Sequence, residues 1–177
     1  MPAASNSPAQ AADASTAPAL DPATLERLRR GVPLRLDRTG RFHFEGDEVA
    51  HPRVHALFLD GLDLDDAGEP TLHVGAQWCY LTVDDTPLRA TAVLRDDAGA
   101  PQLRLDDGRL VPLAPATLWD DGQGLRASVP ARRSGRPLAV RLLNTAAMDL
   151  TAWLDDGDPP RLHVADHARE IPTTPPR

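Results

Sequence analysis

From Leu34 onward, apolar and polar residues alternate over short runs, which is the pattern of half-buried β-strands. The alternation predicts strands over residues 34–37, 41–45, 70–75, 78–83, 88–95, 102–106, 109–113, 125–130 and 137–142. Asp-rich sequences, most ending in Gly, separate many of these runs and are typical of turns with positive φ. They lie at residues 65–68, 96–99, 106–108, 120–122 and 155–157. No EF-hand pattern accompanies them, so we interpret the Asp pairs as turn residues rather than calcium ligands.

Three segments carry helix signals. Asp21 can cap a helix over residues 22–30, and Pro52 can open a second helix over residues 51–62. A third helix is predicted over residues 145–154. We expect Phe58 and Trp153, on the second and third helices, to be core residues whose replacement by Ala costs about 3–5 kcal/mol.

The order of these elements predicts an α+β protein, rich in antiparallel strands. Its C-terminal half resembles a pleckstrin-homology-like barrel capped by a helix. We expect two subdomains, a helix–hairpin–helix unit over residues 21–75 and a barrel-like unit with a closing helix over residues 76–164. Residues 1–20 are mostly Ala, Ser, Pro and Thr and predict a disordered lead, and residues 165–177 predict a flexible tail.

Charge and composition exclude several classes of protein. The 177 residues carry 19 basic and 26 acidic side chains, and this acidic balance argues against nucleic acid as a partner. No run approaches the roughly 20 apolar residues of a membrane span, and no secretory signal is recognisable, so we expect no membrane partner and a cytoplasmic location. Every basic residue is Arg, which excludes lysine chemistry such as a Schiff base or a P-loop. A single cysteine, Cys79, excludes a disulfide framework.

Candidate catalytic groups each have a simpler structural interpretation. His51 and His55 have the i, i+4 spacing of metal ligands, but Pro52 stands where a metalloprotease has Glu. Cys79 lies in an apolar run and is interpreted as a buried, inert thiol. Asp84 and Asp85 are adjacent, so on a strand their carboxylates would point to opposite faces, and we expect Asp85 to accept backbone N–H bonds. We therefore predict no catalytic residue, no metal and no cofactor, and a protein that is not an enzyme.

One loop is strongly basic. Arg132, Arg133 and Arg136 surround Ser134 and Gly135, and guanidinium groups can bind phosphate with two parallel hydrogen bonds. The loop is therefore a candidate phosphate site, and its alternative interpretation is a solvated hairpin loop.

Several ordered motifs resemble a bacterial family, the proteobacterial domain of unknown function 1285. The family pattern Asp-Gly-x-aromatic-x-x-Glu-Gly is similar to residues 40–46, and its helix with Leu-Phe is similar to Leu57-Phe58. Its extended run ending in Val-x-Asp-x-Pro-Phe is similar to residues 72–88, and its Gly-Leu-x-Ala to residues 124–127. The resemblance covers residues 34–154 and rests on the order of the motifs together.

The chain departs from the family at three places. His51 stands where the family has Arg, Gln77 where it has Glu, and Leu88 where it has Phe. The first two departures remove fixed charges, so a polar pocket built on them would be altered here.

The resemblance implies two small subdomains with duplicated strand and helix elements. No activity is assigned to the family, for which a nucleotide-like ligand between the subdomains and a signalling role have been suggested. The expected function is thus a ligand-binding or regulatory module, with Glu45, His51, Gln77 and Trp78 as ligand-binding residues. The alternative is a protein-interaction adaptor that uses a barrel edge or a groove. The partner is therefore an unknown small molecule or protein.

Overall fold

The structure is a computed structural model that describes residues 20–157, 159–164 and 167–175. Its helices are α1 (Pro22–Arg30), α2 (Pro52–Asp60) and α3 (Asn144–Leu150), with short 3-10 helices η1 (Pro115–Thr117) and η2 (Thr151–Trp153). The strands of the first part of the chain are β1 (Leu34–Leu36), β2 (Phe42–Phe44), β3 (Asp47–Glu48), β4 (Leu62–Leu64), β5 (Pro70–Val74), β6 (Gln77–Tyr80) and β7 (Thr82–Val83). Those of the second part are β8 (Leu88–Arg95), β9 (Pro101–Leu105), β10 (Leu110–Pro112), β11 (Leu118–Asp120), β12 (Leu125–Pro130), β13 (Pro137–Leu142), β14 (Arg161–Val164) and β15 (His167–Glu170).

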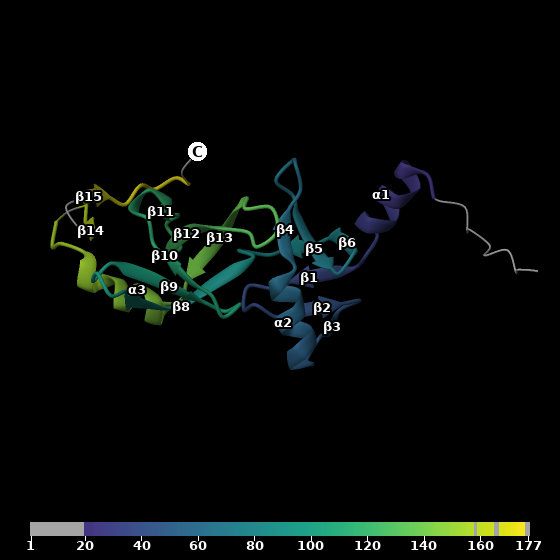
Figure 1. Cartoon of the computed structure of the whole chain (residues 1–177), viewed down its shortest axis with the longest axis horizontal. Helices are drawn as coiled ribbons and strands as arrows, with labels where there is room; N and C mark the ends of the chain where they lie inside the picture. The colour runs from purple at the N-terminus through teal and green to yellow at the C-terminus, as the bar shows by residue number, and fades with distance from the viewer. Residues whose placement is uncertain (1–19, 158, 165–166, 176–177) are drawn as a thin grey trace, which may run out of the picture.

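The molecule has two halves that lie side by side along its long axis (Figure 1). The N-terminal half, residues 20–83, contains sheets of order β3-β2-β1-β7 and β4-β5-β6. The C-terminal half, residues 88–175, contains a six-stranded sheet of order β10-β9-β8-β13-β12-β11, which curls into a half-barrel, and the hairpin β14–β15. Helix α3 packs on β8. The α+β class and the strand-rich, helix-capped C-terminal half are therefore confirmed.

Each half contains one parallel pair of strands. β1 pairs with β7, and β8 pairs with β13, so the first strand of each half lies beside a later strand of the same half. The long connection that a parallel pair needs is a run of antiparallel strands in both halves, and only that of the N-terminal half includes an α-helix. This repeated arrangement of a parallel strand pair closed by antiparallel strands agrees with the expected duplication of elements.

Helix and strand signals in the sequence located most elements. Asp21 caps α1 by accepting a hydrogen bond from the Thr24 N–H at 2.9 Å, and α2 begins at Pro52 as predicted. The predicted second helix is too long, however, because Leu62 leaves it to pair with Leu72 in the sheet of β4 and β5. Five short strands were not predicted from the sequence: β3, β4, β11, β14 and β15.

The boundaries of the halves also differ from the predicted ones. Gln77–Tyr80 pairs with β5 and Thr82–Val83 pairs with β1, so the N-terminal half extends to Val83 rather than to residue 75. Within segment 165–177, for which a flexible tail was predicted, residues 167–170 pair with β14, and the Pro172 carbonyl accepts the Asp120 N–H at 2.9 Å. Nearly all of the predicted disordered lead, residues 1–20, lies outside the described residues.

The Asp-rich turns are held by their own side chains. One carboxylate oxygen of Asp65 accepts the N–H groups of Ala67 and Glu69 at 2.9 and 2.8 Å. Asp96 accepts those of Ala98 and Ala100 in the same way, at 2.9 and 2.7 Å. These bonds support the interpretation of the Asp pairs as turn residues.

One core links both halves, and it includes Phe42, Leu36, Leu88, Leu103, Leu138 and Leu150 as fully buried side chains. Trp153 is buried as predicted, and its indole N–H donates to the Gly99 carbonyl at 3.1 Å. Phe58, also predicted to be a core residue, is only half-buried and packs against the edge of the core, with its ring centroid 5.1 Å from that of Phe42.

Replacing Phe58 with alanine is therefore expected to lower the free energy of unfolding by about 2 kcal/mol, less than full burial would imply. Urea denaturation measures this loss. Leu57→Ala is the matched control, because Leu57 is 47% exposed on the same helix, and it should cost under about 1 kcal/mol. Equal losses in the two variants would contradict the assigned faces of α2.

Candidate functional site

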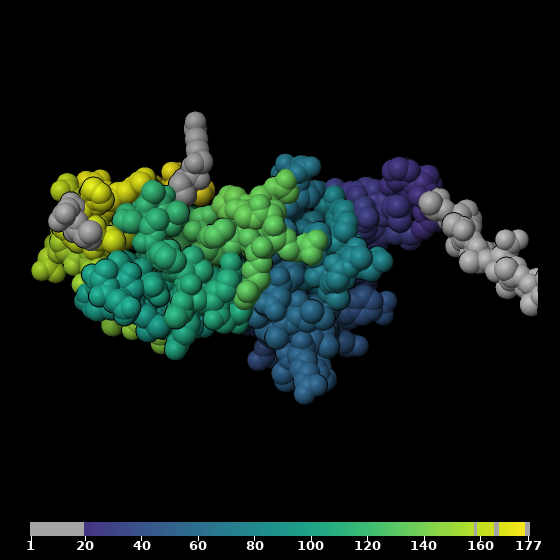
Figure 2. Space-filling model, in the orientation of Figure 1, coloured from purple at the N-terminus to yellow at the C-terminus, as the bar shows by residue number. Residues whose placement is uncertain are grey.

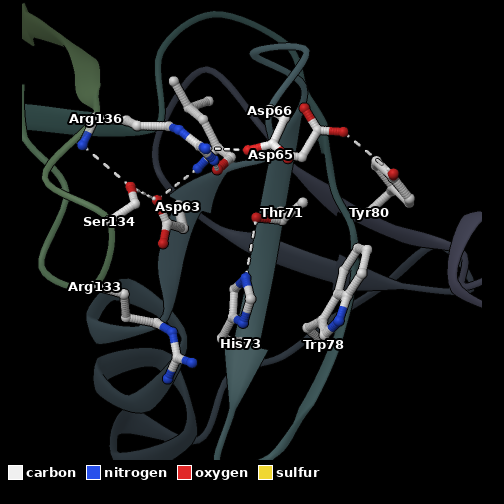
Figure 3. A pocket seen from close by; sticks show the side chains of 11 residues that line it. Asp63, Asp65, Asp66, Thr71, His73, Trp78, Tyr80, Arg133, Ser134 and Arg136 are labelled. Carbon is white, nitrogen blue, oxygen red and sulfur yellow. Dashed lines mark hydrogen bonds and ion pairs between the residues drawn. The ribbon is translucent and has the colours of Figure 1, made fainter.

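A cavity of about 520 Å³ lies between the two halves (Figure 3). One wall is the face of β4, β5 and β6, and the other is the loop between β12 and β13. Figure 2 shows this loop, in light green, against the blue and teal surface of the N-terminal half. The cavity is lined by Asp63, Leu64, Asp65, Asp66, Thr71, His73, Trp78, Tyr80, Arg133, Ser134 and Arg136.

The strand register places the aromatic residues of the cavity on one face. Thr71 is opposite Tyr80, and His73 is opposite Trp78, in the antiparallel pair of β5 and β6. Because alternate residues of a strand share a face, all four side chains point to the same side of the sheet. The His73 and Trp78 rings are stacked, with centroids 5.7 Å apart and planes 18° apart.

Helix α1 supports this aromatic wall. The Arg29 guanidinium lies 4.0 Å from the Trp78 ring centroid, and that of Arg30 lies 3.8 Å from the Tyr80 centroid. Arg30 also bonds Glu69 at 2.6 Å, at the end of the turn before β5. Cation–π contacts of this kind stabilise both partners and fix the ring positions.

The opposite wall is tied to the first by polar bonds. The Ser134 hydroxyl donates to Asp63, which is 5% exposed, and the Arg136 guanidinium donates to the Leu64 carbonyl at 2.7 Å and to Asp66. These groups are about 70 residues apart in the sequence. The bonds therefore fix the width of the cavity by joining the β12–β13 loop to β4.

Arg133 has no ion pair among the described residues and lines the border of the cavity, on the side of His73 away from Trp78 (Figure 3). Burial, and then the positive charge of Arg133, lowers the pKa of His73 below its usual value, so the imidazole is neutral at pH 7. Besides its aromatic wall, the cavity is lined by three aspartates, Asp63, Asp65 and Asp66, and by two arginines. Arg136 pairs with Asp66, so Arg133 is the lining group that could bind an anionic substituent of a planar ligand.

Gly61 holds the strand that carries His73. The Gly61 carbonyl accepts the His73 N–H at 2.9 Å, and a β-carbon at Gly61 would lie 2.0 Å from the His73 carbonyl oxygen. The close approach of α2 to β5 therefore requires glycine at the end of the helix.

The structure separates the four predicted ligand-binding residues. Trp78 lines the cavity, whereas Gln77 points to the other face of β6. Glu45 lies in the exposed β2–β3 turn with φ of 53°, and His51 caps α2 by accepting the Arg53 N–H. Neither Glu45 nor His51 lines the cavity.

The structure also divides the basic loop. Arg132 bonds Asp60 at 3.2 Å and Arg136 bonds Asp66, so both guanidinium groups are paired across the two halves. Of the three, Arg133 is the arginine whose guanidinium has no ion pair among the described residues and could therefore bind a ligand. The loop is therefore not a fully solvated hairpin loop, because two of its three arginines pair with aspartates of the N-terminal half.

The other candidate groups have structural partners. Asp85 pairs with Arg126 and Arg141 instead of accepting backbone N–H bonds. These pairs, chiefly the hydrogen bond from Arg141, lower the pKa of Asp85 to about 2. Burial raises the pKa of Cys79, which makes its thiol less reactive. His55 bonds the Gly40 carbonyl. Within the described residues, no three His, Cys, Asp or Glu side chains form a metal-binding group.

A second cavity of about 530 Å³ is an apolar groove on the opposite face of β6. This apolar groove is lined by Val32, Leu34, Phe44, Val49, Phe58, Leu72, Val74, Gln77, Trp78 and Cys79. Gln77 is its single polar side chain apart from the Trp78 indole N–H and the Cys79 thiol. The groove therefore favours an apolar occupant.

Two crystal structures are similar to this fold, and both are DUF1285 family proteins. The one from Silicibacter pomeroyi DSS-3 has a TM-score of 0.63 and 16% identity over 81% of each chain. The one from Shewanella baltica OS155 has a TM-score of 0.55 and 17% identity, over 69% of this chain and 92% of the other. The fold is thus shared with DUF1285 proteins, which confirms at the level of the fold the resemblance carried by the ordered motifs.

No protein-family model and no curated protein matches the sequence. In the described part of the chain, no helix has the length and apolar character to cross a bilayer.

Among the cavity residues, the sequence singled out Trp78 through a family motif and Arg133 and Arg136 through the basic loop, but not Asp63, Thr71, His73 or Tyr80. The signal for three of them was present, since Thr71 and His73 alternate on one strand and Tyr80 alternates with Trp78 on the next. Pairing the two predicted strands as a hairpin across Gly75-Ala76 would have placed these side chains on one face.

Proposed function

We propose that this protein is a ligand-binding module with its site in the cavity between the two halves. The supporting observation is that side chains from distant segments converge there: His73 and Trp78 from the β5–β6 hairpin, and Arg133 and Ser134 from the β12–β13 loop. A cavity with aromatic walls and a few convergent polar groups is the usual form of a small-molecule site.

The ligand we propose is planar and carries an anionic group. Its ring would pack against the His73 and Trp78 wall, and its anion would pair with Arg133. A nucleotide-like molecule meets both requirements. Because the site joins two halves, occupancy would favour one arrangement of the halves, which is how a regulatory or signalling module responds to its ligand. The chain's composition is compatible with a cytoplasmic protein of this kind.

A thermal-shift screen with nucleotides and aromatic carboxylates tests this proposal. A ligand at 100 times its dissociation constant stabilises the fold by about 2.7 kcal/mol, which is readily detected. Any compound that binds should lose at least tenfold in affinity with Arg133→Gln and with Trp78→Ala. The matched control is Arg53→Gln, an exposed arginine on α2 that lines neither cavity. Equal affinities of Arg133→Gln and Arg53→Gln for every binder would contradict the assigned site.

A protein-interaction adaptor is the second candidate function, and a different observation favours it. The apolar groove exposes Phe44 and Val74 by 46% and 37%, on a face that the ligand cavity does not use. Apolar grooves of this kind accept amphipathic segments of partner proteins. Variants in the groove that leave small-molecule binding intact would separate the two functions.

A further inference from the structure

Helix α1 has an apolar surface that its own subunit leaves uncovered. None of its nine residues is buried against the described part of the chain, and Leu28 is 55% exposed. Its contacts with the body include the stacking of Arg29 on Trp78 and of Arg30 on Tyr80, and the bond from Arg30 to Glu69. A helix of nine residues is not stable alone, so an additional contact on the Leu28 side would stabilise it.

The apolar groove offers the complementary surface. Val49, Phe58 and Leu72 line it and Phe44 borders it, and no described residue fills it. Most of the groove lies on the face of β6 that carries Gln77 and Cys79, and Trp78 borders both the groove and the ligand cavity. Helix α1 is held on the other face, against the rings of Trp78 and Tyr80. Because Arg29 and Arg30 fix α1 on that side, the helix cannot at the same time cover the groove of its own subunit.

The charges around the two surfaces are complementary. The last turn of α1 is basic, and its Arg27 has no ion pair among the described residues. The β2–β3 hairpin beside the groove is acidic, and its Glu45 and Asp47 are exposed and likewise have no ion pair in the described ranges. An occupant with an apolar ridge and a flanking basic residue therefore fits the groove better than an acidic one.

We infer that the groove binds α1 of a second copy of this protein, with Leu28 inserted beside Phe44 and Arg27 facing Asp47. Since each copy carries both surfaces, the contact is made twice around a two-fold axis. A nine-residue helix is about 14 Å long, and one such contact is smaller than the roughly 1,200 Å² of a specific interface. Two such contacts still make a small interface, so we expect a dimer that dissociates on dilution.

Sedimentation of the full-length chain over a range of concentrations tests this inference. The wild-type protein should form a dimer at high concentration, and Leu28→Glu and Phe44→Glu should each raise the dimer dissociation constant at least tenfold. Leu110→Glu is the matched control, because Leu110 is also 55% exposed but lies on β10 in the other half, and it should dimerise like the wild type. Melting curves verify that each variant is folded.

Mixing the two groove-contact variants gives a sharper test. A Leu28→Glu chain keeps an intact groove and a Phe44→Glu chain keeps an intact α1, so the mixture regains one of the two contacts. We expect heterodimers in the mixture at concentrations where each variant alone is monomeric. The charges can be exchanged in the same way. Arg27→Glu and Asp47→Arg should each weaken the dimer, and a chain that carries both changes should dimerise as the wild type does.

Three outcomes would overturn the inference. The first is a wild-type protein that stays monomeric at every concentration, which would mean that the groove binds another part of its own chain or a different protein. The second is a Leu28→Glu variant that dimerises as tightly as Leu110→Glu. The third is a mixture of the two groove-contact variants that forms no heterodimer although both variants are folded.

Discussion

Replacing Gly61 with alanine is expected to lower the free energy of unfolding by about 4 kcal/mol or more, above the usual cost of about 1–3 kcal/mol for an overpacked core site. The new β-carbon would lie 2.0 Å from the His73 carbonyl oxygen, which belongs to the backbone of a central strand and cannot rotate away. Either α2 or β5 must move, and the hydrogen bond from the His73 N–H to the Gly61 carbonyl weakens as it does. Chemical denaturation measures the loss.

The same substitution should also disturb the ligand cavity, because β5 carries His73 and Thr71 into it. The emission of Trp78, which stacks on His73, is expected to change, and any ligand found for the cavity should bind more weakly. A second variant separates this effect from general strain at a helix end. Gly31→Ala alters the matching residue of α1, where the nearest atom to a new β-carbon is the Arg27 carbonyl oxygen at 3.2 Å.

Both glycines end nine-residue helices with negative φ, so neither needs glycine for its backbone conformation. Gly31→Ala should therefore cost under about 1 kcal/mol. Losses of similar size at the two positions would show that the contact with β5 is unimportant.

The longer elements were predictable because they carry enough residues to show a period. The strands 88–95, 125–130 and 137–142 have the bounds that alternation predicted, and so does helix 22–30 with its Asp21 cap. β3 and β11 have two and three residues, too few for alternation to be recognised. The end of α2 was misplaced for a different reason. Leu62 continues the apolar pattern of the helix, and only its pairing with Leu72 shows that it belongs to a strand.

The candidate site was less predictable than the fold, because it is made by contacts between distant segments. Asp63 meets Ser134 across 71 residues, and Asp63 belongs to no recognisable motif. The basic loop that carries Ser134 was singled out from the sequence and does line the cavity, but its sequence does not tell which arginine stays unpaired. That depends on Asp60 and Asp66, which the packing of the halves brings to Arg132 and Arg136.

Arg89 is the residue whose loss should affect the joint between the halves most. It lies on β8 with only 4% of its side chain exposed, and its guanidinium donates to the Asp37 carbonyl at 2.6 Å, in the β1–β2 turn of the other half. Asp106 lies 3.7 Å away and supplies the opposing charge. Burial lowers the pKa of Arg89 and raises that of Asp106, and the attraction between the two charges opposes both shifts.

Replacing Arg89 with alanine is therefore expected to lower the free energy of unfolding by about 3–5 kcal/mol, because Asp106 becomes a buried charge without its partner and the turn carbonyl of Asp37 loses its donor. Calorimetry should show the single transition broadening as the halves unfold less cooperatively. Arg104→Ala, on the neighbouring strand with an exposed side chain, should change the free energy by under about 1 kcal/mol. Arg89→Met keeps most of the side-chain volume, so it distinguishes packing from charge. If Arg89→Met were as stable as the wild type, the guanidinium would contribute nothing to the joint, and the halves would be held by the shared apolar core alone.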